Sequence, residues 1–296
     1  MATFLPAPTP LQFSTVPSYE SAPFVSGFEM AVTGATTLTV QPGMCRALTS
    51  SQVIAYPSFS ASVPGVITVD VSTVGPNGCY PVSLASLGLG LFTQFPVYAC
   101  FDTAGTSRNP ANSAVSGPGF CVVVATANNF LPAGYDAFRR IGWAYVDDDT
   151  LNLIPMIQDG HGDLRTYILQ DGIQVVSGSS TAQATVDLSS GDLPIPRAVI
   201  GLTAGNRKVL LNAQVAPNAA GGWVSVEPGN ATAGSVAPAQ VFGSVAAQPS
   251  SSMIEMIATP NATTGDMEVK YFVDNGGSVG TLTVIGFEDS LANALI

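Results

Sequence analysis

Glycine and proline are spread along the whole chain, and this feature limits most strongly what the chain can fold into. The 296 residues include 30 glycines and 22 prolines, which interrupt helices and favour turns. Between them, apolar and polar side chains alternate: in residues 66–72, Ile67, Val69 and Val71 fall on one face of an extended strand. Alternation with a period of two is typical of a half-buried β-strand. The chain is therefore predicted to be all-β.

Further segments carry strand patterns. Residues 184–189 alternate in the same way, and the continuous apolar run at residues 121–125 predicts a strand buried on both faces. Residues 267–273 also alternate, and they are followed by a turn sequence at 274–277 and a second alternating stretch at 281–285. These last three segments together predict a β-hairpin.

Helix signals are weak. Short helices are expected only at residues 84–87, at residues 137–141 and from Asp289 to the C-terminus, since prolines and glycines interrupt longer stretches.

The strand patterns indicate two domains behind an extended segment. We expect a proline-rich N-terminal arm at residues 1–30, a β-sandwich or barrel at residues 31–165, and a C-terminal jelly-roll-like β-sandwich at residues 166–296. A glycine-rich stretch just before residues 164–172 suggests the boundary. Sequence patterns do not contain the strand order, so a jelly roll and an immunoglobulin-like sandwich stay open as alternatives.

Residues 1–30 combine five prolines with four phenylalanines and two leucines. The prolines exclude a helix and disfavour a central strand. An extended apolar segment gains nothing when it stands alone in water. The arm is therefore expected either to lie along a neighbouring subunit or to pack on its own domain.

The chain carries few charges. Its 20 acidic and 9 basic residues give a net charge of −11, and only 10% of residues are charged. A nucleic-acid-binding face needs clustered basic residues, so no nucleic-acid partner is expected. Residues 71–101 and 228–254 are free of charge, but prolines and polar residues interrupt them, so no membrane insertion is expected. Such stretches fit surfaces hidden in a homo-oligomer or a larger assembly, because interface cores are depleted of charge.

The four cysteines are too far apart in the sequence for a metal-binding CxxC pair, and a single histidine excludes a site of two cysteines and two histidines. Each has apolar neighbours, so buried free thiols are favoured. The first residues show no signal peptide, which fits synthesis in a reducing cytoplasm.

Two acidic segments are candidates for binding chemistry. Residues 147–149 are three consecutive aspartates that could hold calcium, but the EF-hand spacing is absent and a solvated turn is favoured. His161 lies between aspartates in a glycine-rich stretch, and without a G-x-S-x-G motif a turn residue is favoured over a catalytic base. A hydrolase acting on surface polysaccharide would need paired carboxylates, and no pair stands out. The sequence predicts no catalytic, metal-binding or cofactor-binding residue, no cofactor and no enzymatic activity.

Trp143 and Trp223 could stack on sugar rings in a groove of a β-sandwich. This makes a carbohydrate-binding module that recognises host surface glycan an alternative function. Burial of both tryptophans in the core is favoured, because tryptophan is highly buried on average.

Arg139 and Arg140 stand in the most distinctive segment, residues 136–143. In an extended strand their side chains point to opposite faces. One could then be solvated while the other pairs with a carboxylate, for instance in residues 147–149. A structural salt bridge is favoured over contact with a ligand.

Residues 131–142 resemble the signature "LPsGY-x-x-x-RRIG" of virion structural proteins of tailed bacteriophages. Further segments are similar to that family's motifs in the same order, at residues 37–46 ("i-x-V-x-x-G-x-x-R"), 97–105 ("V-Y-x-I-x-D-s-x-G") and 185–189 ("t-s-V-D-L-S"). The likeness extends from residue 37 to about residue 290. It departs from the family after the arginine pair, where an "R-T-D-G-S" turn is absent, and the N-terminal arm is not part of the pattern.

The resemblance implies a virion part and no enzymatic residue. It predicts a structural component of the exterior of a phage particle, made in the host bacterial cytoplasm and located in the virion. A tail appendage, such as a fibre base, an adaptor or a receptor-facing module, is favoured, and capsid decoration is the alternative. Trimers are common in such parts, so a homotrimer in contact with other tail or capsid proteins is expected.

Overall fold

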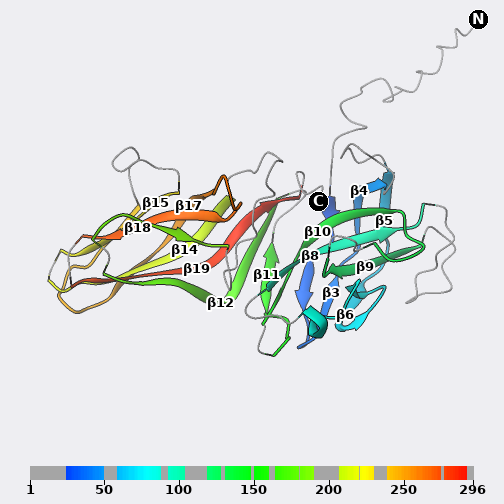
Figure 1. Cartoon of the computed structure of the whole chain (residues 1–296), viewed down its shortest axis with the longest axis horizontal. Helices are drawn as coiled ribbons and strands as arrows, with labels where there is room; N and C mark the ends of the chain where they lie inside the picture. The colour runs from blue at the N-terminus through cyan, green and yellow to red at the C-terminus, as the bar shows by residue number, and fades with distance from the viewer. Residues whose placement is uncertain are drawn as a thin grey trace, which may run out of the picture.

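The computed structural model describes residues 25–49, 59–87, 93–103, 119–127, 131–147, 150–159, 164–179, 181–189, 207–219, 221–229, 239–274 and 277–291. Within these residues the chain is built from β-strands, with one short 3-10 helix at Leu84–Leu87, as predicted. The all-β prediction is confirmed. Strands gather in two lobes that lie side by side (Figure 1). None of the described residues forms a helix long and apolar enough to cross a membrane.

The first lobe contains β1 (Val25–Gly27), β2 (Met30–Val32), β3 (Thr37–Val40), β4 (Gly43–Thr49), β5 (Phe59–Val63), β6 (Ile67–Val74), β7 (Gly78–Tyr80), β8 (Thr93–Phe101), β9 (Phe120–Ala125), β10 (Ala137–Val146) and β11 (Met156–Asp159). Hydrogen bonds join its strands in the order β5, β4, β10, β8, β9, β7, β6, β3, β2, β11. The β1–β2 segment closes this order into a curled sheet, because β1 pairs with β4 and β2 pairs with β3 and β11.

The second lobe contains β12 (Leu164–Gly178), β13 (Ala184–Asp187), β14 (Arg207–Ala216), β15 (Trp223–Pro228), β16 (Ala239–Phe242), β17 (Ser250–Pro260), β18 (Met267–Val273) and β19 (Val279–Ser290). One sheet has the order β12, β19, β14, β17, and the other has the order β13, β18, β15, β16. Eight strands divided between two antiparallel sheets in this way form a jelly roll. The strand order thus decides between the two sandwich types that the sequence left open.

Alternation identified the strands correctly. Ile67, Val69 and Val71 of β6 are at most 3% exposed, and alternate residues of β18 are buried. Every residue of β9 is buried, which confirms the strand predicted to be covered on both faces.

The predicted hairpin between residues 267–273 and 281–285 is wrong. Both segments are strands, but β18 pairs with β13 and β15, whereas β19 pairs with β12 and β14. The connection between them crosses from one sheet of the jelly roll to the other. The alternation is real, because each strand turns one face to the core between the sheets and one face outward.

The helix predicted at residues 137–141 is also wrong, and the helix predicted from Asp289 is wrong at its first two residues. Residues 137–141 belong to β10, which pairs with β8 along Thr93–Phe101, and Asp289 lies in β19, which pairs with β12. In both cases pairing with a strand distant in the sequence outweighs a weak local helix preference. Residues 292–296 lie outside the described residues.

The end of the predicted arm belongs to the first lobe. Val25 is 1% exposed in β1 and Phe28 is fully buried against Gly43, so residues 25–30 pack on their own chain. Residues 1–24, including the five prolines of the arm, lie outside the described residues.

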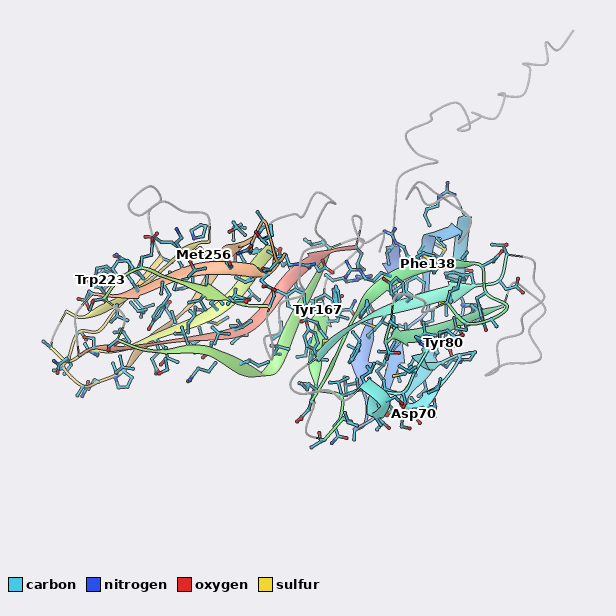
Figure 2. The ribbon with its side chains drawn as sticks, viewed as in Figure 1. Asp70, Tyr80, Phe138, Tyr167, Trp223 and Met256 are labelled. Atoms are coloured by element: carbon cyan, nitrogen blue, oxygen red, sulfur yellow. The ribbon has the colours of Figure 1, made fainter. Side chains whose placement is uncertain are left out.

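The two lobes are joined by continuous structure. β12 pairs with β11 of the first lobe at one end and with β19 along its length, and residues 165 and 166, where the sequence suggested a boundary, lie within it. A single cluster of buried apolar side chains extends through both lobes. Tyr167, near the middle of the molecule, belongs to this cluster (Figure 2).

Candidate functional site

The arginine pair lies on β10 at the boundary between the lobes. β10 pairs with β8, and the register shifts between Arg140 and Gly142, so one residue is extra on the β10 side. Such a bulge bends a strand and re-aims its side chains. Arg139 is 1% exposed and Arg140 is 5% exposed. The expectation that one of them is solvated is therefore wrong, and both must find partners inside the protein.

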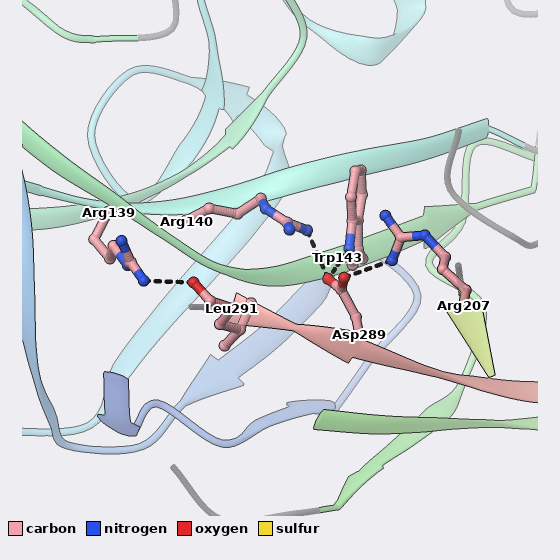
Figure 3. Close-up of polar contacts among 6 residues, drawn as sticks. All are labelled: Arg139, Arg140, Trp143, Arg207, Asp289 and Leu291. Atoms are coloured by element: carbon pink, nitrogen blue, oxygen red, sulfur yellow. Dashed lines mark hydrogen bonds and ion pairs between the residues drawn. The ribbon is translucent and has the colours of Figure 1, made fainter. Parts of the chain in front are cut away.

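Asp289, near the end of β19, is the partner of Arg140. One carboxylate oxygen, Oδ2, accepts hydrogen bonds from Arg140 Nη1 and from Trp143 Nε1, each at 2.8 Å. The other oxygen, Oδ1, accepts from Arg207 Nη1 of β14. Figure 3 shows these three side chains converging on the carboxylate. The guanidinium of Arg140 also lies over the Trp143 ring, 4.6 Å from its centre, in a cation–π contact.

The charges set the protonation of this centre. Burial by itself would raise the pKa of Asp289, but Arg140, Arg207 and the Trp143 hydrogen bond hold it well below its ordinary value of 3.8. Asp289 is therefore ionised at every physiological pH. The single negative charge of Asp289 is shared between buried Arg140 and Arg207, which is 13% exposed, so loss of this carboxylate would leave positive charge inside the protein without a counter-charge.

Two further arginines bind backbone carbonyls across the boundary. Arg139 Nη2 donates to the carbonyl of Leu291, and Arg165 Nη2 of β12 donates to the carbonyl of Gly27 in β1. Arg165 is 1% exposed. Each guanidinium thus ties one lobe to a backbone carbonyl of the other, and hydrogen bonds with a charged donor are stronger than neutral ones.

An aromatic cluster lies beneath the ionic one. Tyr145 of β10, Tyr167 of β12 and Phe287 of β19 are at most 1% exposed, and Phe287 stacks on Tyr167 with ring centres 4.8 Å apart. Tyr145 meets Phe287 edge to face at 6.3 Å. Burial raises the pKa of Tyr145 and of Tyr167, so both remain neutral. A Cβ at Gly142 would lie 2.3 Å from Met30 Cε and 3.0 Å from the Tyr167 hydroxyl, so only glycine fits there without displacement.

The residues of the "LPsGY-x-x-x-RRIG" segment therefore have structural roles. Gly134 adopts a positive φ of 89°, and Tyr135 is buried. Arg139 and Arg140 join the lobes, Ile141 is fully buried and Gly142 allows close packing. We call this set of contacts around Arg139, Arg140, Asp289 and Arg207 the interlobe clamp.

The sequence patterns predicted part of the interlobe clamp. A structural salt bridge for the arginine pair is confirmed, but its carboxylate is Asp289, 149 residues beyond Arg140, and not one of residues 147–149. Asp147 accepts a hydrogen bond from the Thr150 amide in the turn after β10, and residues 148 and 149 lie outside the described residues. No local pattern marks Asp289 or Arg207 as partners, because their proximity depends on the packing of β19 and β14.

The two tryptophans occupy different environments. Trp143 is partly buried and bonded to Asp289. Trp223 lies at the end of the second lobe far from the first lobe (Figure 2), on the outer face of the sheet that contains β15. There it contacts Phe272 at 4.8 Å and Phe242 at 6.5 Å between ring centres. Phe242 is 60% exposed, so this aromatic patch is a surface feature and not part of the core.

A surface pocket of about 440 Å³ lies between β2 and β11. Its lining includes Glu29, Gln41 and Asp159 beside Met30 and Ile157. Sequence patterns missed it, because its walls come from the end of the predicted arm and from a strand more than a hundred residues later.

The other candidate residues form no metal-binding or catalytic group within the described residues. His161 lies outside the described residues, and across the described ranges no group of three or more histidine, cysteine or acidic side chains is close enough to hold a metal ion. Glu255 and Glu288 both bind Lys208 Nζ at 2.9 Å. The four cysteines are buried free thiols, as predicted.

Comparisons with known proteins give no family. No protein-family model matches the chain, and no curated protein matches it. Among solved structures, one similar chain comes from the structure of the Gx strain of infectious bursal disease virus, with 11% identity and a TM-score of 0.23. The alignment covers 91% of this chain and 67% of that chain. A likeness at this level carries no conclusion about function.

Proposed function

We propose that the protein is a non-enzymatic structural component of the exterior of a phage virion. The interlobe clamp is the observation that carries this proposal. Residues 131–142, which resemble the virion-protein signature, supply two of its three arginines, Arg139 and Arg140, and both bind residues of the second lobe. The motif thus helps to join the two lobes into one unit with a shared core, which supports a role as a component of a particle.

The second lobe supports the same proposal. A jelly roll recurs in viral capsid and lectin domains, although a fold by itself does not establish a function. Apolar side chains on this lobe face solvent: Met253 is 72% exposed, Phe242 60% and Val245 48%. The first lobe also exposes apolar side chains, among them Ile157 at 61%, so both lobes offer apolar surface for contact with other proteins. We infer assembly through these surfaces, as a homotrimer within a tail appendage.

Immunogold labelling of intact virions of the phage that encodes the chain tests the proposal. Gold at the tail tip or collar is the expected result. Gold spread over the head would instead assign the protein to capsid decoration, and no gold on any particle would contradict the virion proposal. Light scattering of the purified protein at micromolar concentration tests the trimer, and a sharp monomer would contradict assembly through its own surfaces.

The aromatic patch favours a second candidate, recognition of host surface glycan. Trp223, Phe242 and Phe272 form a partly exposed group of tilted and edge-to-face rings, and a sugar ring could stack on one of them. A glycan array probes it: binding lost in Trp223→Ala and retained in Trp143→Phe would support this candidate. If the wild-type protein binds no host surface glycan on the array, this candidate function is excluded.

A further inference from the structure

Two of the four cysteines face each other across neighbouring strands. Cys100 of β8 and Cys121 of β9 are direct partners in the antiparallel register. Both are 0% exposed, and both belong to a small apolar cluster separate from the main core. Their thiols are free. The cluster is bordered by Tyr80 and Phe138, which Figure 2 labels in the first lobe.

We propose that Cys100 and Cys121 are an oxidative modification site, at which the two thiols close to a disulfide when the protein meets a small-molecule disulfide. Directly opposed residues of antiparallel strands have Cα atoms about 4.5–5.5 Å apart. A disulfide needs a Cα separation of about 4.4–6.8 Å. The strand pairing therefore places the two Cα atoms at a separation that a disulfide allows, without movement of the backbone. Because the two residues are opposite each other, their side chains also point to the same face of the sheet.

The other two cysteines lack this arrangement. Cys45 pairs in register with Val25 and Ala61, and Cys79 pairs with Val124. Both belong to the main core, on the other side of the sheet from the Cys100–Cys121 cluster. The Cys79 thiol donates to the carbonyl of Val71 at 3.2 Å. They serve as internal controls within the same chain.

The reaction is a pair of thiol–disulfide exchanges. One cysteine thiolate attacks a sulfur of oxidised glutathione, which forms a mixed disulfide and releases one glutathione thiolate. The second cysteine then attacks the protein sulfur of that mixed disulfide and releases the second glutathione. Two protein thiols are oxidised, one glutathione disulfide is reduced to two thiols, and the two protons that leave the cysteines pass to the two glutathione thiolates.

Burial makes this closure slow. Desolvation and the hydrogen-bonded contact with Cys121 raise the pKa of Cys100 well above its ordinary value of 9.0, so the reactive thiolate is scarce. Tyr135, which is 8% exposed, contributes to the cover of the cluster. Closure therefore requires transient opening of this cover.

The use of the site rests on the proposed function. A virion component is made in a reducing cytoplasm, where the pair stays as thiols, and is later released to oxidising surroundings. The disulfide would then tie β8 to β9 and restrain the unfolded chain, which stabilises the first lobe. The chemistry can be measured on the purified protein, so its outcome does not depend on where gold labels a particle.

The test is mass spectrometry of the intact chain. Reduced protein is incubated with oxidised glutathione, and a second sample is refolded from urea in the same buffer so that burial does not limit access. After alkylation under denaturing conditions, the number of alkylated cysteines should fall from four to two, with a loss of about 2 Da before alkylation. Chymotrypsin should yield residues 99–101 linked to residues 121–130. The melting temperature should rise by about 5 °C.

Variants separate this pair from the other thiols. Cys100→Ala and Cys121→Ala should each abolish the loss of mass, whereas Cys79→Ala should retain it. Four free thiols in both wild-type samples would overturn the proposal. A linkage through Cys45 or Cys79, or a glutathione adduct that persists, would overturn it as well.

Discussion

Arg140 in the first lobe donates to Asp289 in the second at 2.8 Å, and each of these side chains is 5% exposed. Arg207 and Trp143 complete the coordination of the same carboxylate. The link between the lobes is therefore a buried ionic contact beside an aromatic cluster. Its removal should lower the stability of both lobes.

The variant Asp289→Asn should lower the free energy of unfolding by about 3–5 kcal/mol, because it leaves Arg140 and Arg207 buried without a counter-charge. Urea denaturation followed by tryptophan fluorescence measures this change. Glu255→Gln is the matched control, since Glu255 is 64% exposed in its ion pair with Lys208 and solvent screens that pair. Equal midpoints for the two variants would contradict a structural role of the interlobe clamp.

Asp289 should also make stability depend on pH. Its pKa in the folded protein lies below the ordinary value of 3.8, so the unfolded chain takes up the proton first as pH falls. The contribution is fully present above about pH 5 and is lost progressively as pH falls below that value toward the folded-state pKa. Urea midpoints between pH 7 and about pH 3 should decline less steeply in Asp289→Asn than in the wild type. If the urea midpoints of the two proteins declined in parallel as pH falls, a group other than Asp289 would control stability in acid.

Gly286 in β19 should not tolerate a side chain. A Cβ there would lie 2.3 Å from the backbone carbonyl oxygen of Tyr167, which cannot move away as a flexible side chain could. Gly286→Ala should destabilise by about 1–3 kcal/mol through this overpacking. Gly178→Ala, at the end of β12 with open space around its Cβ, should be neutral. Thermal melting of the two variants makes the comparison.

The aromatic patch should contribute little to folding. Phe242 is 60% exposed, so Phe242→Ser should change the free energy of unfolding by less than about 1 kcal/mol. Val226→Ala, at a fully buried position of the neighbouring strand β15, should cost about 2 kcal/mol through lost burial and a cavity. If Phe242→Ser were the more damaging variant, the patch would be part of the fold and not a surface for partners.

Single strands were predictable because each one repeats a local pattern. The buried faces of β6 and β18 follow from period-two alternation, and the continuous apolar run of β9 follows from burial on both faces. Their neighbours were not predictable. The segment 281–285 alternates as a hairpin partner of β18 would, yet it belongs to the opposite sheet, since alternation specifies which face is buried and not which strand lies alongside.

In the interlobe clamp, too, a local pattern was informative but the partner distant in the sequence was not predictable. The rarity of basic residues singled out Arg139 and Arg140, and the possibility of an extended backbone there led to the expectation that one of them pairs with a carboxylate. The identity of that carboxylate could not be read from the sequence, because Asp289 lies in a segment with a weak helix signal and is 149 residues away from Arg140.

Local patterns in the sequence are enough to predict the all-β class, the buried faces of several strands and the buried cysteine thiols. These properties depend on residues within a few positions of one another. The jelly-roll order, the partners of the arginines and the pairing of Cys100 with Cys121 emerge only when distant strands pack together. Each of these depends on which distant strands hydrogen-bond, and the backbone groups that make those bonds are the same in every residue except proline.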